Sequence, residues 1–299
     1  MAKIYKISIW RRALWHLNRT PAARIVKWIR RVVAAKSIRN RRRLAATLVP
    51  TLLERGMSEQ LNREGYAIVT EAMDQLALQS LDIATNELYE RAKSRAVKQE
   101  SSHKDFWTRL LDEEKQNDKL STDNPFVAFA LQPAVLSILS KAYGELPHLD
   151  YVLLTLSRDT GKALSFSQLW HRDHDDTRVI KLFVYLTDVA SLEDGPLTFI
   201  PGPTSDIFGF SLHSQTPDAV VGSRVSPDDV ISLIRPKLSV FLVETSRCLH
   251  MGSRLALGHE RLLYTATFIS VPRLFPEPPP RFSLTGRESE LIRCVLSPA

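Results

Sequence analysis

Two histidines and one aspartate form the most informative pattern of residue types in this 299-residue chain. His171 and Asp173 are separated by a single residue, and His250 lies much further along the sequence. Two imidazoles and one carboxylate can hold one face of an Fe(II) ion and leave the opposite face open for chemistry. On a β-strand, residues i and i+2 project to the same side, so His171 and Asp173 can reach one metal ion while Arg172 points away. The pattern predicts the metal centre of an oxygenase.

Segments that favour β-strands lie next to these candidate ligands. Residues 178–187 and 238–243 are rich in β-branched and aromatic side chains, and a third such run begins directly after Arg261. A ligand pair and a distant third ligand require a fold that returns the chain to one cavity, as a double-sheet jelly roll does. We therefore predict a mainly β protein with helical additions, in which a double-stranded β-helix (jelly roll, cupin-like) is buttressed by N-terminal helices.

Arg261 is the candidate residue for binding a co-substrate. Together with Leu263, Thr265 and Thr267 it shares one face of the third predicted strand. If that face lines the cavity, it places a planar and permanently charged guanidinium near the metal ion, where it can bind a carboxylate through two hydrogen bonds. The sequence therefore indicates a dicarboxylate co-substrate.

The sequence resembles the phytanoyl-CoA dioxygenase family of Fe(II)/2-oxoglutarate-dependent oxygenases over residues from about Glu64 to Val271. Four motifs carry the resemblance: Trp170-His171-Arg172-Asp173, Tyr185-Leu186-Thr187-Asp188, Asp194-Gly195-Pro196-Leu197-Thr198-Phe199-Ile200-Pro201-Gly202, and His250 with Arg261 eleven positions later. The resemblance implies that His171, Asp173 and His250 bind iron. It also implies that Arg261 holds the distal carboxylate of 2-oxoglutarate.

The same resemblance implies a reaction. Dioxygen and 2-oxoglutarate would be co-substrates, 2-oxoglutarate would be decarboxylated to succinate, and a small or lipid-linked organic substrate, such as a lipid or an envelope sugar, would be hydroxylated. Related halogenases carry Gly or Ala in place of the ligand aspartate, so Asp173 favours hydroxylation. Gln168 and Thr198 are weaker candidates for the remaining co-substrate contacts.

The chain departs from the family pattern at two turns. Pro203-Thr204 follows Pro201-Gly202 where the family often continues with Ser-His, and Met251 separates His250 from Gly252-Ser253. These departures spare the predicted metal ligands and concern the finer contacts to the co-substrate.

Structural roles compete with the functional ones. A lone His-x-Asp pair is common on surface strands, a second copy begins at His174, and His250 could be a buried core histidine. The combination with a remote histidine, an arginine and intervening strands favours metal ligation, and we expect His174 near the mouth of the cavity.

Two other classes of protein stay open. A cupin-like metal-dependent isomerase would not need Arg261, and a catalytically silent membrane- or nucleic-acid-binding module would be expected to lack a ligand.

Composition agrees with a globular enzyme. Hydrophobic residues make up 44% of the chain, which is enough to fill a sizeable core. Two cysteines, Cys248 and Cys294, offer neither a disulfide framework nor a zinc pattern, so we expect a reducing compartment, namely the cytoplasm. Since no segment approaches about 20 uninterrupted apolar residues, we predict no membrane-spanning helix.

Charge is concentrated at the N-terminus. Fourteen Lys and Arg residues precede the first acidic residue, Glu54, whereas the rest of the chain has 26 basic and 33 acidic residues. A predicted helix beginning near Pro21 carries an apolar stripe at helical spacing, formed by Ile25, Trp28, Ile29, Val32 and Val33. An earlier stripe is formed by Ile7, Trp10, Leu14 and Leu17.

Residues 1–43 have four possible roles. Basic amphipathic helices with tryptophan bind anionic membrane surfaces, here the inner face of a membrane. The segment could instead pack on the acidic body of the protein, or act as an organellar transit peptide. Nucleic-acid binding is the weakest option, because no recognisable nucleic-acid-binding fold accompanies the basic residues. We expect no cleavable secretion signal, because charges interrupt every apolar run.

We divide the chain into a basic helical arm, residues 1–50, and a jelly-roll dioxygenase domain, residues 51–299. The domain is predicted to contain a helical buttress over 57–145 and a β core over about 148–273. Within and after these parts we predict a short helix and strand over 57–70, helices over 74–99, 106–118 and 133–143, and a C-terminal helix near 288–294.

Overall fold

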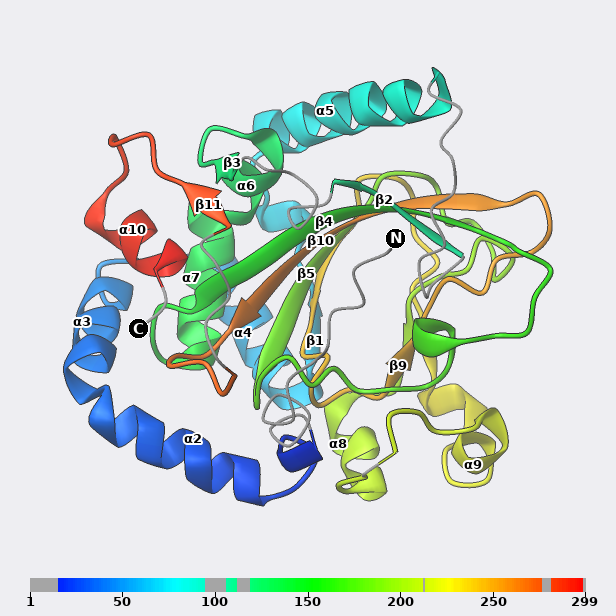
Figure 1. Cartoon of the computed structure of the whole chain (residues 1–299), viewed down its shortest axis with the longest axis horizontal. Coiled ribbons are helices and arrows are strands. Elements are labelled where there is room, and N and C mark those ends of the chain that lie inside the picture. The colour runs from blue at the N-terminus through cyan, green and yellow to red at the C-terminus, as the bar shows by residue number, and fades with distance from the viewer. Residues whose placement is uncertain (1–15, 95–105, 112–118, 212, 276–280, 298–299) are drawn as a thin grey trace, which may run out of the picture.

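The computed structural model describes residues 16–94, 106–111, 119–211, 213–275 and 281–297. Its centre is a six-stranded antiparallel sheet, faced on one side by helices and on the other by a small sheet (Figure 1). The strands of the large sheet, in spatial order, are β1 (Tyr66–Ile68), β8 (Val240–Val243), β5 (Val179–Tyr185), β10 (Glu260–Ile269), β4 (His148–Arg158) and β2 (Trp107–Leu111). The small sheet contains β7 (Ile231–Ser232), β6 (Thr198–Phe199) and β9 (His250–Met251). The predicted helix-buttressed jelly roll is confirmed.

Alternation along the central strands separates a core from a cavity. On β5, Leu182 and Val184 face the helices, whereas Lys181 and Phe183 face the small sheet. The paired strand β10 repeats the pattern, with Tyr264 on the helical side. The large sheet therefore buries one apolar face and presents a second face on which polar groups can stand.

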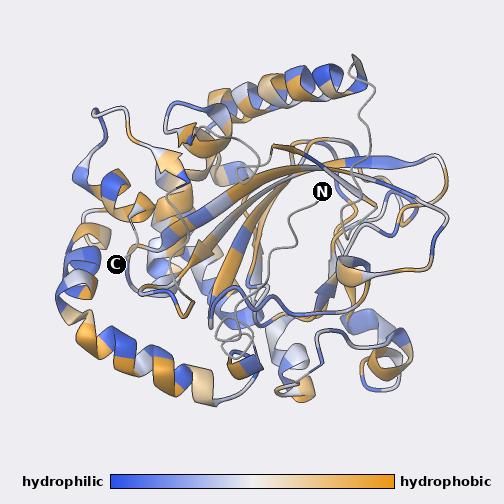
Figure 2. Ribbon diagram, in the orientation of Figure 1, coloured by the Kyte–Doolittle hydropathy of each residue, from blue (hydrophilic) through white to orange (hydrophobic). Residues whose placement is uncertain are grey.

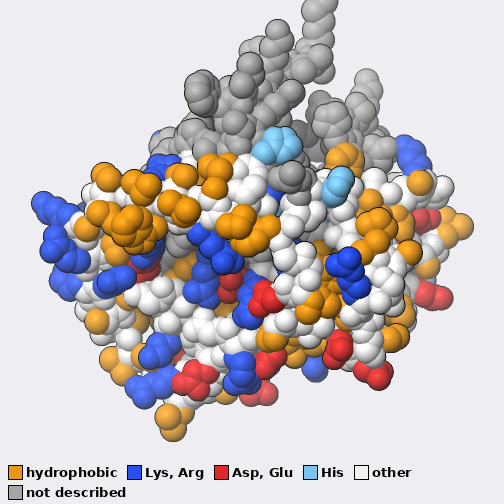
Figure 3. Space-filling model, turned by 90° about the horizontal axis from the view of Figure 1, so that it is seen from below, with side chains coloured by type: hydrophobic (Ala, Val, Ile, Leu, Met, Phe, Trp, Pro, Cys, Tyr) orange, Lys and Arg blue, Asp and Glu red, His pale blue; other side chains and the backbone are white. Residues whose placement is uncertain are grey.

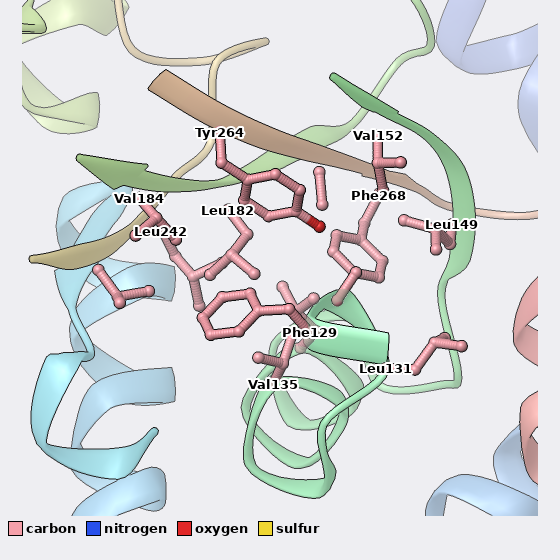
Figure 4. Close-up of a cluster of buried hydrophobic side chains, with 14 of the residues drawn as sticks. Phe129, Leu131, Val135, Leu149, Val152, Leu182, Val184, Leu242, Tyr264 and Phe268 are labelled. Atoms are coloured by element: carbon pink, nitrogen blue, oxygen red, sulfur yellow. The ribbon is translucent and has the colours of Figure 1, made fainter. Parts of the chain in front are cut away.

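Helices α4 (Leu52–Glu64), α5 (Gln75–Ser94), α6 (Pro125–Ala130) and α7 (Pro133–Tyr143) form the helical layer. The limits of α4 follow from its sequence, because Thr51 and Glu54 form a reciprocal capping box and Gly65 ends the helix with a φ of 82°. In Figure 4, Phe129 and Val135 from α6 and α7 meet Leu182, Tyr264 and further residues of the sheet. The predicted helix over 133–143 is confirmed residue for residue, and α5 confirms most of the predicted helix over 74–99.

Short elements complete the fold. A two-stranded parallel sheet joins β3 (Leu120–Ser121) to β11 (Phe282–Ser283), and α10 (Glu290–Leu296) confirms the predicted C-terminal helix. The remaining short helices are η1 (Thr70–Ala72), η2 (Phe166–Gln168), α8 (Gly202–Ser205), η3 (Asp206–Phe208), α9 (Asp218–Gly222) and η4 (Pro227–Asp229).

The helix predicted over residues 106–118 is wrong where the structure describes it. Residues 107–111 form β2, which pairs with β4 at the edge of the large sheet, with Trp107 opposite Ser157. Hydrogen bonds to an existing strand outweigh weak local helical propensity at such an edge. Residues 112–118 lie outside the described residues, as do Ile7, Trp10 and Leu14 of the earlier apolar stripe.

The basic N-terminal segment forms α2 (Ala22–Val33) and α3 (Ala35–Ala45), which curve around one end of the molecule (Figure 1). Ion pairs with buried carboxylates attach α2 to the body of the protein. Lys27, only 5% exposed, pairs with Asp176, and Arg31 donates to both carboxylate oxygens of Glu145 at 2.7 Å. Among the described residues, no helix is both long and apolar enough to cross a membrane.

Replacing Lys27 with Met is expected to destabilise the protein by about 3 kcal/mol, because it leaves the buried Asp176 carboxylate without its cationic partner. Urea unfolding measures this free energy. Lys36→Met, at an exposed position of α3, is the control and is expected to change stability by less than about 0.5 kcal/mol. Equal effects of the two substitutions would show that the Lys27–Asp176 pair does not attach the arm.

A second prediction concerns His148, the first residue of β4. Burial lowers its pKa to about 4, against the opposing charge of Asp150, whereas an unfolded histidine has a pKa of about 6.5. The unfolded chain therefore binds a proton first, so His148 contributes stability above pH 6.5 that is lost as the pH falls towards 4. We expect His148→Gln to reduce the pH dependence of unfolding free energy in this window by about 1.4 kcal/mol per pH unit. An unchanged slope would contradict the prediction.

Candidate metal centre

His171 and His250 lie opposite each other across a pair of backbone hydrogen bonds. The amide of each residue donates to the carbonyl of the other at 2.9 Å. β9 is paired in turn with β6, where Phe199 faces His250. Because directly paired residues project to the same side of a sheet, both imidazoles point to one face, and their ring centroids are 4.2 Å apart.

Asp173 completes the group. Its amide donates to the carbonyl of Thr245 at 2.9 Å, which fixes the segment after His171 beside the segment before His250. Oδ1 of Asp173 lies 3.9 Å from Nε2 of His171, and Oδ2 lies 3.6 Å from Nε2 of His250. One ligand atom from each of the three residues falls within 4.8 Å of the others, so all three can reach a single ion.

Both imidazoles are oriented for ligation by Nε2. Nδ1 of His171 lies 2.8 Å from the carbonyl oxygen of Leu169, and Nδ1 of His250 lies 3.0 Å from that of Cys248. A carbonyl only accepts, so each Nδ1 carries the proton and each Nε2 presents a lone pair. Neither Nε2 has a hydrogen-bond partner within the described part of the chain. The donor set fits a divalent transition metal such as Fe(II).

The electrostatic surroundings keep these ligands in their metal-binding forms. Burial lowers the pKa of His171 to about 3, and burial also lowers the pKa of His250. Burial opposes ionisation of Asp173, but the charge of Lys181 holds the pKa of this carboxyl well below its usual range. Neutral imidazoles and an ionised carboxylate are the forms that bind a metal ion.

Lys181 is a residue that sequence reasoning missed. It stands on the cavity face of β5, and its Nζ lies 2.8 Å from Oδ2 of Asp173 and 4.0 Å from a carboxylate oxygen of Asp175. Burial alone would lower the pKa of Lys181, but Asp173 raises it above its usual value. In the sequence, Lys181 is a single lysine within an apolar predicted strand. The alternation of that strand places Lys181 on the side opposite the core.

Arg261 is a buried cation, 2% exposed, whose described partners are neutral. It donates to the carbonyl of Gly195 and, at 2.8 Å, to Oγ of Ser253. Gly195 has a φ of 61°, and a side chain there would collide with Leu255, which explains the glycine of the Asp194-Gly195 turn. Among the described residues no carboxylate forms an ion pair with Arg261. A buried charge without a counterion is costly, so this position favours an anionic ligand.

Ser253 organises the surroundings of Arg261. Its hydroxyl accepts from Nε1 of Trp107 at 3.0 Å and lies 3.1 Å from the hydroxyl of Ser157. Sequence reasoning noted the displaced Gly252-Ser253 pair as a departure and assigned Ser253 no role. In the structure, Ser253 takes a φ of 60°, which is unusual for a residue with a side chain.

Two cavities meet at two of the three candidate ligands, His171 and Asp173. Cavity A, of about 390 Å³, is lined by His171, Asp173, His250, Lys181 and Arg261 among others. It also contains Leu263 and Thr265, so the predicted cavity face of β10 is confirmed for these residues. Cavity B, of about 660 Å³, shares His171 and Asp173 and extends to residues 18–24 and 206–224.

The other predicted site residues have different surroundings. His174 lines cavity B, and its expected place near the mouth of the cavity stays a prediction. Gln168 donates to the carbonyl of Ser253 at 3.0 Å, and the hydroxyl of Thr198 lies 2.9 Å from that of Ser232. Neither residue is among those lining cavity A or B. Their contact with a co-substrate stays a prediction.

No protein-family model matches the sequence, and a search of curated proteins finds no match. Among solved structures, the non-heme alpha-ketoglutarate-dependent epimerase SnoN from nogalamycin biosynthesis is 16% identical with a TM-score of 0.50, over 73% of this chain and 83% of SnoN. AviO1 from Streptomyces viridochromogenes Tue57 is 18% identical with a TM-score of 0.52, over 77% of this chain and 100% of AviO1.

A third structure is EctD from S. alaskensis, solved with 2-oxoglutarate and 5-hydroxyectoine. It is 14% identical with a TM-score of 0.52, over 72% of this chain and 76% of EctD. At these identities the similarity establishes the fold, which is the jelly roll that these enzymes share. The resemblance to phytanoyl-CoA dioxygenases stays a prediction from the sequence motifs.

Measurements of metal binding can show which of the two His-x-Asp sequences, the one beginning at His171 or the one beginning at His174, holds the metal ion. We expect the protein to bind one Co(II) ion in place of Fe(II), with affinity abolished by His171→Ala or His250→Ala because each removes one of three ligands. Isothermal titration calorimetry under anaerobic conditions measures the affinity. His174→Ala removes the histidine of the second copy and is expected to leave binding within about twofold. Loss of binding in His174→Ala alone would move the metal centre to the second copy.

Proposed function

We propose that this protein is an Fe(II)/2-oxoglutarate-dependent dioxygenase that hydroxylates a small or lipid-linked organic substrate. The observation that supports the proposal most strongly is the composition of cavity A. It combines two histidines with available Nε2 atoms, an ionised Asp173 and the buried Arg261, which forms no ion pair with a described carboxylate. The jelly-roll fold shared with 2-oxoglutarate-dependent enzymes is consistent with this composition.

Each group has a role in this function. His171, Asp173 and His250 would hold Fe(II), which supplies open coordination positions and redox chemistry for reaction with dioxygen. Arg261 would bind the distal carboxylate of 2-oxoglutarate, with Ser253 and the Gly195 carbonyl fixing the orientation of its guanidinium. Lys181 holds Asp173 ionised and in place through their ion pair.

Cavity B is the proposed binding site for the substrate to be hydroxylated. It shares His171 and Asp173 with cavity A but is not lined by Arg261, so substrate and co-substrate would occupy different spaces beside the candidate ligands. Its lining mixes the aromatic side chains of Phe208 and Phe210 with many hydrogen-bonding groups. Such a lining suits a molecule with polar, hydroxyl-bearing and apolar parts, and supports a sugar-like or lipid-linked substrate.

A cupin-like metal-dependent isomerase is the alternative function. The same three ligands would serve it, but it would have no use for a buried arginine in the ligand cavity and would not consume 2-oxoglutarate. Formation of succinate separates the two functions.

The test is succinate formation on admission of oxygen to anaerobically Fe(II)-loaded protein with 2-oxoglutarate. We expect a slow signal from the wild type that His171→Ala reduces to background. Arg261→Ala is expected to raise the KM for 2-oxoglutarate about 10- to 100-fold, because hydrogen bonds to charged groups contribute roughly 1.5–3 kcal/mol each.

Arg158→Ala is the matched control for the arginine substitution. Arg158 lies on the neighbouring strand, exposed and paired with Glu260, and it lines neither cavity. It should leave the KM for 2-oxoglutarate unchanged. The absence of succinate, together with no binding of 2-oxoglutarate to the iron-loaded protein, would favour the isomerase. Detection of a product that contains one oxygen atom more than the substrate would identify hydroxylation.

A further inference from the structure

Helix α2 directs its apolar side away from the protein. The predicted stripe of Ile25, Trp28, Ile29, Val32 and Val33 is exposed along its whole length, with Trp28 65% and Val33 84% accessible. Figure 2 shows hydrophilic and hydrophobic residues alternating along this helix. An apolar stripe usually marks the side of a helix that packs on the core. Here a different interaction must hold the helix.

The polar side of α2 provides that attachment. In addition to Asp176, the ammonium of Lys27 donates to the carbonyl of Ser270 at 3.0 Å. The guanidinium of Arg31 donates to the carbonyl of Val271 at 2.8 Å and forms the bidentate pair with Glu145. These buried contacts fix the rotation of the helix about its axis. The outward direction of Trp28 is therefore set by the fold.

The surroundings of the stripe are basic. Figure 3 shows a band of hydrophobic side chains on this face of the molecule, with Lys and Arg side chains along its border. The exposed basic residues of α2 and α3 include Arg24, Lys36, Arg39 and Arg42. Because the first acidic residue of the chain is Glu54, no carboxylate from these two helices reduces their positive charge.

We propose that the exposed stripe of α2 is a membrane-docking surface, which inserts into the interfacial region of a bilayer containing anionic lipids. Tryptophan and aliphatic side chains between lysines and arginines suit the boundary between acyl chains and negatively charged headgroups. A second copy of the chain is a poorer occupant, because two faces with the same positive charge repel each other. A membrane offers acyl chains to the apolar stripe and negatively charged headgroups to its basic border.

The docking surface adjoins cavity B. Thr20, Ala23 and Arg24, at the start of α2, line the cavity, and the guanidinium of Arg24 lies 5.1 Å from the ring centroid of Phe210. A protein docked through α2 would thus hold one wall of this cavity at the lipid surface. This consequence rests on the proposed function and assigns the substrate to the amphiphiles of the membrane. Docking itself does not depend on the iron chemistry.

Cosedimentation of the full chain with vesicles tests the docking surface. Vesicles of phosphatidylcholine with phosphatidylglycerol are compared with vesicles of phosphatidylcholine alone, without iron or 2-oxoglutarate. We expect the wild type to bind the anionic vesicles, more weakly as salt is added. Trp28→Ser combined with Ile29→Ser should reduce the partition coefficient about tenfold or more, because it removes apolar area that would enter the bilayer.

Leu76→Ser combined with Ile83→Ser is the matched control. Both residues are exposed on α5, at 73% and 61%, away from the basic segment, and their replacement should leave vesicle binding unchanged. Val33→Ser is a further variant, with one substitution within the stripe. Because all of these side chains are exposed, thermal unfolding of each variant should match that of the wild type, which excludes misfolding as the cause of any loss.

Two results would overturn the proposal. One is equal binding of anionic vesicles by the wild type and the Trp28→Ser/Ile29→Ser variant, or no binding by either. The other is a wild-type dimer that the same double variant converts to a monomer in sedimentation velocity, which would make the stripe an interface between copies. Since the measurement needs no turnover, loss of docking leaves the oxygenase proposal standing, and failure of succinate formation leaves docking standing.

Discussion

Backbone pairing between His171 and His250 is the interaction on which the site depends. It joins two segments that are far apart in the sequence and closes the small sheet over the cavity face of the large one. The two imidazoles then share one side of the pair, and the carbonyls of Leu169 and Cys248 set their orientation. The main chain rather than a flexible side-chain contact therefore positions both rings.

The cavity face of the large sheet adds charge to this geometry. Strands β5 and β10 alternate, so the apolar packing that stabilises the fold occurs on one face while Lys181 and Arg261 stand on the other. Lys181 has carboxylate partners, including Asp173. Arg261 has neutral described partners, and its burial gives a negatively charged ligand a large electrostatic advantage. Lys181 and Arg261 therefore have different electrostatic surroundings within one cavity, the first beside carboxylates and the second beside neutral groups.

Helix α2 shows how charge can reverse the usual orientation of an amphipathic helix. The acidic partners Asp176 and Glu145 lie buried in the body of the protein and draw Lys27 and Arg31 inwards. The cost of removing these charges from water is offset by close pairing and by carbonyl acceptors. With the polar side engaged in this way, the apolar side of α2 faces outwards. Of the roles considered for the N-terminal segment, packing on the body is what the structure shows for α2 and α3, and it leaves their outer face available for another surface.

Local sequence was enough to predict the elements with a strong local period and the residues with distinctive chemistry. The strand over 262–268 and the helix over 133–143 were predictable because alternation, helical spacing and flanking Pro and Gly act within a few residues. The candidate site could be assembled from His171, Asp173, His250 and Arg261 because few folds use such a set. Four features could not be read from local sequence, because they depend on how the sheets and helices pack. Residues 107–111 form a strand, and Trp28 faces outwards, because of partners distant in the sequence. Ser253 contacts Arg261 and Lys181 pairs with Asp173 across only eight positions, but each contact requires the fold to place both side chains in one cavity.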